Sequence, residues 1–469
     1  MIAARIVEQE GSLLTIDPVA NLGLRRELPG LAAAFDGDMM RVVICEALAG
    51  AGSRIDSCQP GRATYLPGEG ATVRYRLRMG SAAGRADPGL DTVAASGSDE
   101  RIVCARVFPD PAMSRRYVDE RLAPLASRAA GRPETAPFEA IVAHVEPLAI
   151  ALSVFPVDGD LPMLVDATDP ERMLRVLSAM VGETFGGCRV DVVAYPRRGR
   201  CVLRYRLDPG DRTFYGKITA GGEGALTAEV VEGLRPLVAV PRCLGYDPGL
   251  RLVLMEPLEG QPGISRLLRG EGQHGATLPE QLARAAVTGG ALHTSGLGLG
   301  ADRTFESEIS SLRGQLGAIR RHAPELGNQL DLWLDRAEKI AWASIPLPRG
   351  LAHGDFTHSQ IVFDHRGRPG LLDFDDFCQA EPALDLGQFT AYLSLGVARA
   401  GAQPPLPLPQ VFMAAYTEAT GIEPEPLADR HAAYEICSFV RMAVHAWHKL
   451  KGVRLGHVLL SLSQARGAP

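Results

Sequence analysis

Several carboxylates and one amide in the stretch LAHGDFTHSQIVFDHRGRPGLLDFDDF, residues 351–377, are spaced as parts of a single site. Asp355 precedes the short apolar run IVF, and Asp373 follows a second apolar run, GLL. The intervening DHRGRP contains Asp, Gly and Pro, so the two runs predict an antiparallel hairpin joined by a tight turn. Pairing about the middle of this turn places Gln360 beside Asp373 at the open end of the hairpin, with Asp355 in the loop just upstream.

This arrangement predicts the chemistry of phosphoryl transfer. Mg²⁺ takes oxygen ligands and is commonly held by one or two side chains together with substrate phosphates, so Gln360 and Asp373 are the expected metal ligands. A carboxylate close to a hydroxyl can orient that hydroxyl and accept its proton during the transfer, and Asp355 is the expected catalytic residue.

A cation must hold a nucleoside triphosphate from the opposite side, because carboxylates alone repel its phosphates. Lys217, in the middle of a predicted strand, is the candidate. The chain has four lysines among its 49 basic residues: Lys217, Lys339, Lys449 and Lys451. In a chain that otherwise uses Arg, a lysine at this position indicates a need for a compact ammonium group. Glu229 and Glu232 lie three residues apart on the following predicted helix, and either could fix Lys217.

An internal repeat precedes the carboxylate-rich stretch. Residues 65–77 read YLPGEGATVRYRL and residues 195–207 read YPRRGRCVLRYRL. In each copy a second strand, a helix and a final apolar strand follow, so one small sheet-plus-helix unit is expected twice. Arg106 of the first copy stands where the second copy has Lys217, and no HGD or DFD segment follows it. The first copy is therefore not expected to transfer phosphate, but to cap the active lobe or to shape the acceptor site.

From residue 263 onward the apolar residues recur at helical spacing. A small β-rich lobe joined to a larger helical lobe predicts an α+β, bilobal fold. We expect three segments. Residues 1–165 would form the cap, a degenerate copy of the small lobe; residues 166–262 would form the small lobe; and residues 263–469 would form the helical lobe with the catalytic loop.

Composition excludes several other classes of protein. The net charge of -6 gives no basic footprint for nucleic acid, and the 46% hydrophobic and 22% charged residues are typical of a globular protein. Eight scattered cysteines without a C-x-x-C pair argue against a zinc site or a disulfide scaffold. With no apolar run that suits a signal peptide or a membrane span, a cytoplasmic protein without nucleic-acid or membrane partners is expected.

These residues resemble the aminoglycoside phosphotransferase/choline kinase-like small-molecule kinases, relatives of the protein-kinase fold. The shared pattern is HGD, four residues and an amide, then a hairpin, a D-F-x metal motif and a DLA-like segment. It stands here as His353-Gly354-Asp355, Gln360, Asp373-Phe374 and PALDLG with Asp385. A clear G-x-G-x-x-G loop is absent, since YPRRGRC at residues 195–201 has one glycine.

The resemblance implies further roles. Lys217 and Glu229 would be the pair at the nucleotide phosphates. The segment LMEPLEG, residues 254–260, would connect the lobes and bind adenine through its backbone near Glu256 and Leu258. The family usually has Asn where this chain has Gln360. The maltokinase-like branch is similar in having Gln there and an N-terminal β-rich cap, and this similarity implies a sugar or sugar-like acceptor.

The function expected from the sequence is a Mg²⁺-dependent kinase that transfers phosphate from ATP or GTP to a hydroxyl of a small molecule. Two other classes stay open. The duplicated lobe and Gln360 are consistent with a non-catalytic nucleotide-binding or scaffold protein. A metal-dependent phosphoesterase could use His353, Asp355 and the aspartates of residues 373–376, but it would have no use for Lys217.

Overall fold

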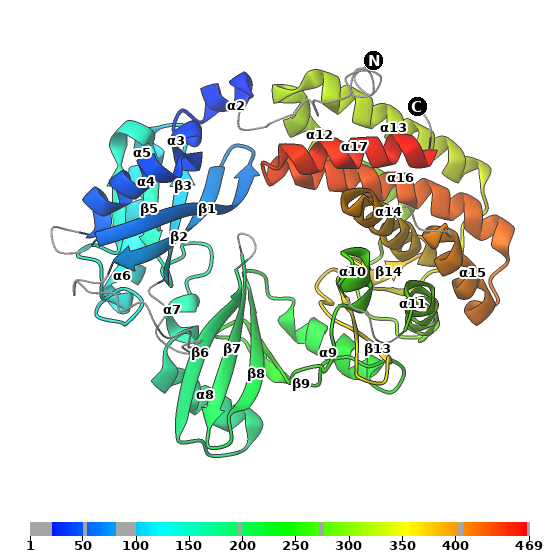
Figure 1. The fold of residues 1–469 in the computed structure, drawn as a ribbon, viewed down its shortest axis with the longest axis horizontal. Coiled ribbons are helices and arrows are strands. Elements are labelled where there is room, and N and C mark those ends of the chain that lie inside the picture. Colours follow the sequence, from blue (N-terminus) through cyan, green and yellow to red (C-terminus); the bar gives the residue numbers. More distant parts are fainter. Residues whose placement is uncertain are drawn as a thin grey trace.

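The computed structural model describes residues 21–49, 54–80, 100–195, 199–271, 276–401 and 407–466. Two β-sheets and a helical body follow one another around a ring (Figure 1). For reference we call the described residues up to 165 the cap, residues 166–262 the small lobe and residues from 263 onward the helical lobe.

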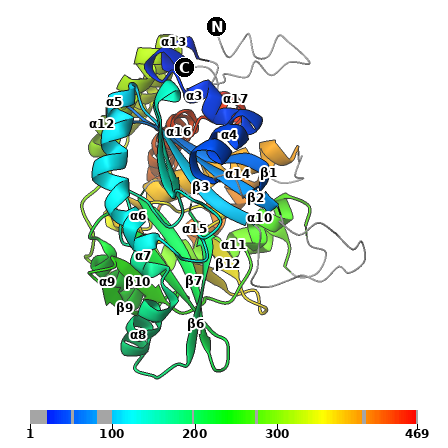
Figure 2. The same cartoon turned by 90° about the vertical axis from the view of Figure 1, so that its left-hand side faces the viewer.

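The cap contains a five-stranded antiparallel sheet with helices on both faces. Its sheet has the order β1-β2-β3-β5-β4. The first helices pack on one face in an apolar core, whereas the later helices cover the other face over a separate apolar cluster (Figure 2). The elements are α2 (Leu22–Glu27), α3 (Leu31–Phe35), α4 (Gly37–Ile44), η1 (Cys45–Ala49), β1 (Arg54–Leu66), β2 (Gly70–Gly80), β3 (Glu100–Val107), α5 (Pro111–Tyr117), η2 (Val118–Leu122), α6 (Ala123–Ala129), β4 (Val142–Val145), η3 (Glu146–Leu148) and β5 (Ile150–Val154).

The small lobe contains a second sheet with the equivalent order, β6-β7-β8-β10-β9. Its elements are α7 (Leu164–Ala167), α8 (Pro170–Val181), β6 (Gly187–Ala194), β7 (Arg200–Asp208), β8 (Arg212–Thr219), α9 (Gly224–Leu234), β9 (Cys243–Asp247) and β10 (Leu252–Met255). The RYRL segments lie on β2 and β7, the second strand of each sheet. Two residues before RYRL in each strand, Thr72 of β2 pairs with Arg106 of β3, and Val202 of β7 pairs with Lys217 of β8. Strand register thus places Arg106 at the position equivalent to Lys217.

The helical lobe is built around α16, which packs against α12, α13, α14 and α17. Two short two-stranded sheets, the β12–β13 hairpin and the pair of β11 with β14, lie between this helical core and the small lobe. The elements are α10 (Gly263–Leu268), α11 (Leu278–His293), α12 (Phe305–His322), α13 (Pro324–Ala343), β11 (Gly350–Ala352), β12 (Ile361–Phe363), β13 (Pro369–Leu371), β14 (Cys378–Ala380), α14 (Pro382–Ala400), α15 (Leu408–Thr420), α16 (Pro424–His448) and α17 (Gly452–Arg466).

A buried arginine of the cap holds the small lobe at the entrance to β7. The Arg74 guanidinium lies 3.6 Å from the centre of the Tyr195 ring and donates to the Tyr195 carbonyl at 3.0 Å. The Tyr195 hydroxyl donates to Asp158, at the end of the cap. Residues 196–198 of the single-glycine segment lie outside the described residues. Arg74 therefore fixes the chain immediately before that segment.

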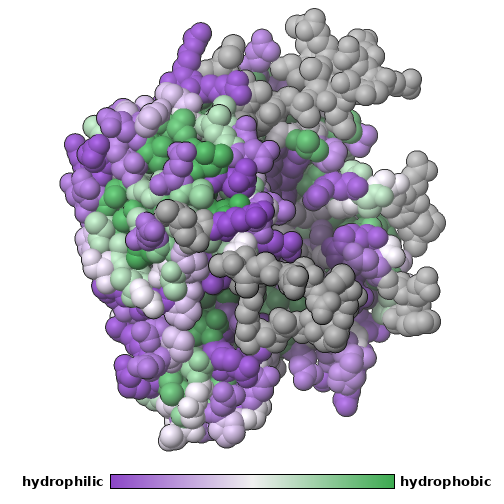
Figure 3. All heavy atoms as spheres, turned by 60° about the vertical axis from the view of Figure 1, so that its left-hand side comes forward, coloured by the Kyte–Doolittle hydropathy of each residue, from purple (hydrophilic) through white to green (hydrophobic). Residues whose placement is uncertain are grey.

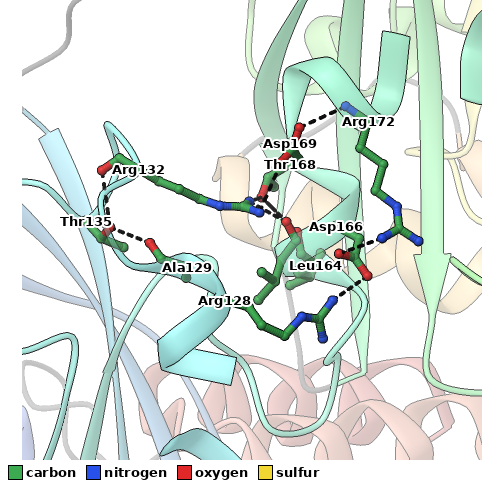
Figure 4. A network of polar contacts seen from close by, with 10 residues as sticks. Arg128, Ala129, Arg132, Thr135, Leu164, Asp166, Thr168, Asp169 and Arg172 are labelled. Carbon is green, nitrogen blue, oxygen red and sulfur yellow. Dashed lines mark hydrogen bonds and ion pairs between the residues drawn. The ribbon is translucent and has the colours of Figure 1, made fainter. Parts of the chain in front are cut away.

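A second polar network joins α6 to the helices that lead into the small lobe (Figure 4). Arg128 and Arg172 bind Asp166 from two sides, at 2.6 and 3.0 Å. Arg132 donates to the Val165 carbonyl and pairs with Asp169 at 3.3 Å. Arg128 and Arg132 each join segments more than 30 residues apart in sequence, and Arg172 shares the Asp166 carboxylate with Arg128. These contacts hold the linker between the two sheets to the cap.

The cap also contacts the helical lobe and so closes the ring. Tyr65 on β1 donates to Glu27 at 2.9 Å, and Glu27 lies 3.0 Å from His322 of α12. The Tyr65 ring also lies against His448 at the end of α16. Leu450, just beyond that helix, is part of the apolar core of the cap. The cap is thus attached to both lobes.

Hydrophilic and hydrophobic side chains are intermixed over the face shown in Figure 3. Among the described helices, none has both the length and the apolar character needed to cross a bilayer.

We predict that Arg74→Ala weakens the attachment of the cap. The variant loses a buried cation–π contact and a hydrogen bond to Tyr195, and the free energy of unfolding is expected to fall by about 2–3 kcal/mol. Chemical denaturation measures this change. Arg76→Ala is the matched control, because Arg76 belongs to the same RYRL segment and is exposed. Equal stabilities of the two variants would contradict the role of Arg74.

Candidate active site

A cavity of about 890 Å³ lies where the three parts of the ring meet. Its lining comes from β1 of the cap and from β6, β7, β8 and the connector after β10 in the small lobe. The helical lobe contributes the β12–β13 hairpin, which we call the catalytic hairpin, with α12, α14, α16 and α17. Six of the predicted site residues line it together: Lys217, Glu256, Leu258, Asp355, Gln360 and Asp373. This volume lies in the range of small-molecule sites.

The predicted hairpin forms, with β12 paired to β13 in a register one residue away from the expected one. Ile361 faces Leu371, and Leu372 donates its backbone N–H to the Gln360 carbonyl at 2.9 Å. Gln360 therefore stands opposite Leu372 rather than Asp373. Its side-chain amide nevertheless reaches Asp373 at 3.3 Å and Asp355 at 3.4 Å. The longer side chain of Gln spans the extra residue.

Asp355 lies in the loop before this hairpin and is held by two amides. Gln388 of α14 donates to one carboxylate oxygen at 2.7 Å, and Gln360 approaches the other. Burial, together with the negative charges of Asp376 and Asp373, raises the pKa of Asp355 above its usual value of 3.8. A carboxylate with a raised pKa is a stronger base toward a substrate hydroxyl.

Asp373 faces Lys217 across the two lobes. The Lys217 ammonium contacts Asp373 and lies 2.6 Å from Asp375. Arg200 of β7 lies 2.8 Å from Asp375 and 3.6 Å from Asp376. Burial alone would raise the pKa of Asp373, but the charge and hydrogen bond of Lys217 outweigh it and lower that pKa. Two cations of the small lobe thus pair with the DFDD segment.

The backbone around these aspartates adopts conformations that serve the site. Asp373 has φ 67°, in the left-handed region that non-glycine residues rarely adopt, and such strain is often kept where a side chain must be aimed. Gly354 also has a positive φ, of 75°, and a Cβ there would collide with the Asp376 carbonyl. The HGD glycine is therefore required by close backbone packing.

Asp385, fully buried, braces the HGD loop. Its carboxylate accepts the backbone N–H groups of His353 at 2.6 Å and Gly354 at 2.9 Å. His293 lies 3.0 Å from the same carboxylate and 2.8 Å from the Tyr416 hydroxyl. Burial would raise the pKa of Asp385, but the hydrogen bond and charge of His293 lower it. His353 in turn donates to the Leu372 carbonyl at 2.8 Å, so loop and hairpin form one unit.

The partner of Lys217 differs from the expectation. Lys217 pairs with Asp373 and Asp375, whereas Glu229 is exposed on α9. Glu232 accepts the backbone N–H of Cys243 at 2.9 Å and pairs with Arg235 at 3.0 Å. The predicted pair between Lys217 and Glu229 is therefore replaced by contacts with the helical lobe, because the DFDD carboxylates come closer than either residue of α9.

The lobe connector lies at the edge of the cavity. Glu256 and Leu258 both line it, after β10 ends at Met255. The Glu256 N–H donates to the Arg242 carbonyl at 2.9 Å, and Pro257 has no N–H. The connector is tied to the catalytic hairpin by reciprocal backbone bonds between Gln261 and Phe363, at 3.0 and 2.8 Å.

The side chains around Gln360 fit a divalent cation. They offer the Asp373 carboxylate, the Gln360 amide oxygen once the amide is turned, and the nearby Asp355 carboxylate, a set of oxygen donors that suits Mg²⁺. The negative charge of Asp373 helps to raise the pKa of Asp355, and a cation beside both carboxylates would relieve this repulsion.

Sequence reasoning missed two residues of this site. Gln388, which binds Asp355, lies one turn after Asp385 on α14, and helical spacing from Asp385 could have indicated it. Arg200 stands at the first position of β7, but local sequence contains no signal for its pairing with Asp375 because the two are 175 residues apart.

Residues 203–428 match the family model described as the phosphotransferase enzyme family. This segment runs from β7 into α16 and contains the six predicted site residues that line the cavity. It confirms the expected protein-kinase-like fold, with a β-sheet lobe and a helical lobe, and the expected enzyme class, a small-molecule phosphotransferase. The finer resemblance to the maltokinase-like branch stays a prediction.

Solved structures similar to this chain include three small-molecule kinases. An ethanolamine kinase from Plasmodium vivax is 13% identical, with 59% of this chain and 82% of that chain covered at a TM-score of 0.44. A choline kinase from Streptococcus pneumoniae is 15% identical, with coverages of 63% and 99% and a TM-score of 0.45. An aminoglycoside phosphotransferase from Streptomyces rimosus is 20% identical, with coverages of 57% and 96% and a TM-score of 0.40. A search of curated proteins gives no match.

We predict that Lys217→Ala and Glu229→Gln have very different effects on phosphotransfer. Lys217→Ala removes the ammonium that is expected to bind the nucleotide phosphates, and kcat/KM for the nucleotide should therefore fall about 10²–10³-fold. Glu229→Gln should stay within about threefold of wild type, since the exposed Glu229 does not hold Lys217 in the structure. Steady-state kinetics at varied nucleotide concentration measures both. A comparable loss in Glu229→Gln would show that α9 supplies the partner during turnover.

The pH profile of kcat/KM should show the raised pKa of Asp355. A general base works only when ionised, so activity should fall as the pH drops through this raised pKa, at a higher pH than for an ordinary aspartate. Asp376→Asn removes one of the negative charges that raise the pKa, and the acidic limb should then move to lower pH. A limb that stays in place or moves to higher pH would contradict this assignment.

Proposed function

We propose that the protein transfers the γ-phosphate of ATP to a hydroxyl of a small molecule, with a sugar or sugar-like compound as acceptor. The observation that carries the proposal is the convergence of Asp355, Gln360 and Asp373 opposite Lys217 in one cavity. The family match supports the phosphotransferase class. The acceptor class rests on the resemblance of the Gln-containing loop and β-rich cap to the maltokinase-like branch.

In this proposal Asp355 is the catalytic residue. The acceptor oxygen forms a bond to the γ-phosphorus, the bond from that phosphorus to the bridging oxygen of ADP breaks, and the hydroxyl proton passes to Asp355. Gln388 and Gln360 hold the two oxygens of Asp355, so the carboxylate meets the hydroxyl in a fixed orientation. Positioning and charge neutralisation then supply most of the rate enhancement.

The cations of the small lobe are proposed to bind the nucleotide phosphates. In the structure Lys217 pairs with Asp373 and Asp375, and Arg200 pairs with Asp375. Phosphate oxygens would compete for these donors. Adenine is proposed to bind the connector at Glu256 and Leu258, where the Leu258 N–H is the donor next to Pro257.

Gln360 and Asp373 are proposed to hold Mg²⁺, which when bound neutralises charge on the phosphate oxygens.

The division of the chain at residues 165 and 262 is part of the same proposal. In it the cap is a degenerate copy of the small lobe in which Arg106 pairs with Glu69 at 3.2 Å and Asp160 at 3.4 Å. Those two pairs occupy the guanidinium that stands in the place of Lys217, so the cap would not bind nucleotide in the same way.

Two aspartate variants test the assignment of roles. Asp355→Ala should lose at least about 10²-fold in kcat while ATP with Mg²⁺ still raises the unfolding midpoint, because a general base contributes on that scale and does not hold the nucleotide. Asp373→Ala should lose the Mg²⁺-dependent part of the midpoint rise. Thermal unfolding with ATP, with and without Mg²⁺, and ADP release measure the two effects. Full activity in Asp355→Ala would remove it from the catalytic role, and no response of the wild-type midpoint to ATP would favour a scaffold protein.

A further inference from the structure

One wall of the cavity is lined by basic side chains that have no role in the proposed phosphate transfer. They come from the hairpin of β1 in the cap, from one face of α16 at four-residue intervals, and from the start of α17. Figure 1 shows the tip of the β1–β2 hairpin next to the beginning of α17. We call the following six residues the basic wall: Arg62, Arg441, His445, Lys449, Lys451 and Arg454.

Among the described residues, one carboxylate pairs with Arg441 of this wall. Glu308 on α12 pairs with Arg441 and, at 2.8 Å, with Arg303, so one acid serves two arginines. Among the residues that the structure describes, no Asp or Glu lies within ion-pair distance of Arg62, Lys451 or Arg454. Arg62, Lys451 and Arg454 line the same cavity, and burial together with the charges of Arg454, Arg62 and Arg399 lowers the pKa of Lys451.

The basic wall lies outside the part of the chain that matches the phosphotransferase family. That match covers residues 203–428, whereas Arg62 precedes it and the other five residues follow it. Three of the four lysines in the chain, Lys217, Lys449 and Lys451, line this one cavity. The first lies among the phosphate-transfer residues and the other two lie in the wall.

The wall is linked to the surroundings of Asp355 through α14. Gln388 binds Asp355 at 2.7 Å, and Tyr392 follows one turn later on α14, about 6 Å along the helix axis. The Arg454 guanidinium lies 6.0 Å from the centre of the Tyr392 ring. The lobe connector and Lys217 belong to the small lobe, whereas the wall belongs to the cap and the end of the helical lobe.

We propose that the acceptor is a hydroxylated small molecule that also carries a phosphate or carboxylate group, and that the basic wall binds this anionic group while the hydroxyl meets Asp355. Arginine and lysine donors at the far end of a cavity orient such a molecule through charge-assisted hydrogen bonds. The cap contributes Arg62, so the site is complete only with the cap attached. The inference rests on the proposed function for the identity of the reaction, but the anion site itself does not depend on catalysis.

Anion binding tests the wall independently of turnover. Inorganic phosphate is titrated by calorimetry into wild type, Arg62→Ala/Lys451→Ala, Lys217→Ala and Lys339→Ala, where Lys339 is the exposed lysine outside the cavity. We expect Kd to rise at least tenfold in the double variant and to change less than twofold in the other two. Absence of binding to wild type, or a loss confined to Lys217→Ala, would overturn the proposal, since the latter would place phosphate among the nucleotide-binding cations.

Acceptor preference tests the chemical class. ADP release is measured with glucose, glucosamine, glucose 6-phosphate and glucuronate as matched neutral, cationic, phosphorylated and carboxylated acceptors. We expect kcat/KM at least tenfold higher for one of the two anionic sugars, which also distinguishes phosphate from carboxylate. Arg62→Ala/Lys451→Ala should raise the KM for that sugar at least tenfold while the KM for ATP changes less than twofold.

A preference for glucose or glucosamine would overturn the anionic acceptor. A rise in the KM for ATP in the double variant would show that the wall holds nucleotide instead. If no acceptor supports ADP release and ATP does not bind, the proposed function fails, whereas the phosphate titration still decides whether the wall is an anion site.

Discussion

The contacts of Lys217 with Asp373 and Asp375 are the interaction on which the arrangement of the site depends. They join a strand in the middle of the small-lobe sheet to the segment that follows the catalytic hairpin, and Arg200 adds a second contact to the same segment. A buried charge that lost its partner would be strongly destabilising, so the four groups constrain one another. The same side chains that we propose to bind the nucleotide phosphates therefore also join the two lobes.

The HGD loop, the β12–β13 hairpin and the lobe connector are held in place by hydrogen bonds to their backbone groups. Asp385 binds two consecutive N–H groups of the HGD loop, and His353 binds the backbone of the hairpin. The connector is tied to the hairpin through Gln261 and Phe363. In our proposal this loop carries the general base, which must be placed accurately against the acceptor, and satisfied buried polar groups make the loop rigid.

The cap turns a cleft between two lobes into a cavity with three walls. Arg74 and the network around Asp166 hold it to the small lobe, and Tyr65 and Leu450 hold it to the helical lobe. In this sheet Arg106 takes the place of Lys217 but is engaged by two acids within the cap. The sheet of the cap presents Arg62 to the cavity, and through this residue the cap enters the acceptor site in our proposal.

The sequence by itself determined the repeat, the hairpin and the residue types of the site, because turn residues, strand alternation and helix spacing are local patterns. It also predicted that Gln360 and Asp373 would meet, although the register differs by one residue and the length of the Gln side chain closes the gap. Only the tertiary structure decided that Lys217 pairs with the DFDD segment rather than with Glu229, and that Arg62 and Lys451, almost 390 residues apart in sequence, line the same cavity. Which charges become partners depends on their separation and burial in space, and no local pattern of the chain encodes these two quantities.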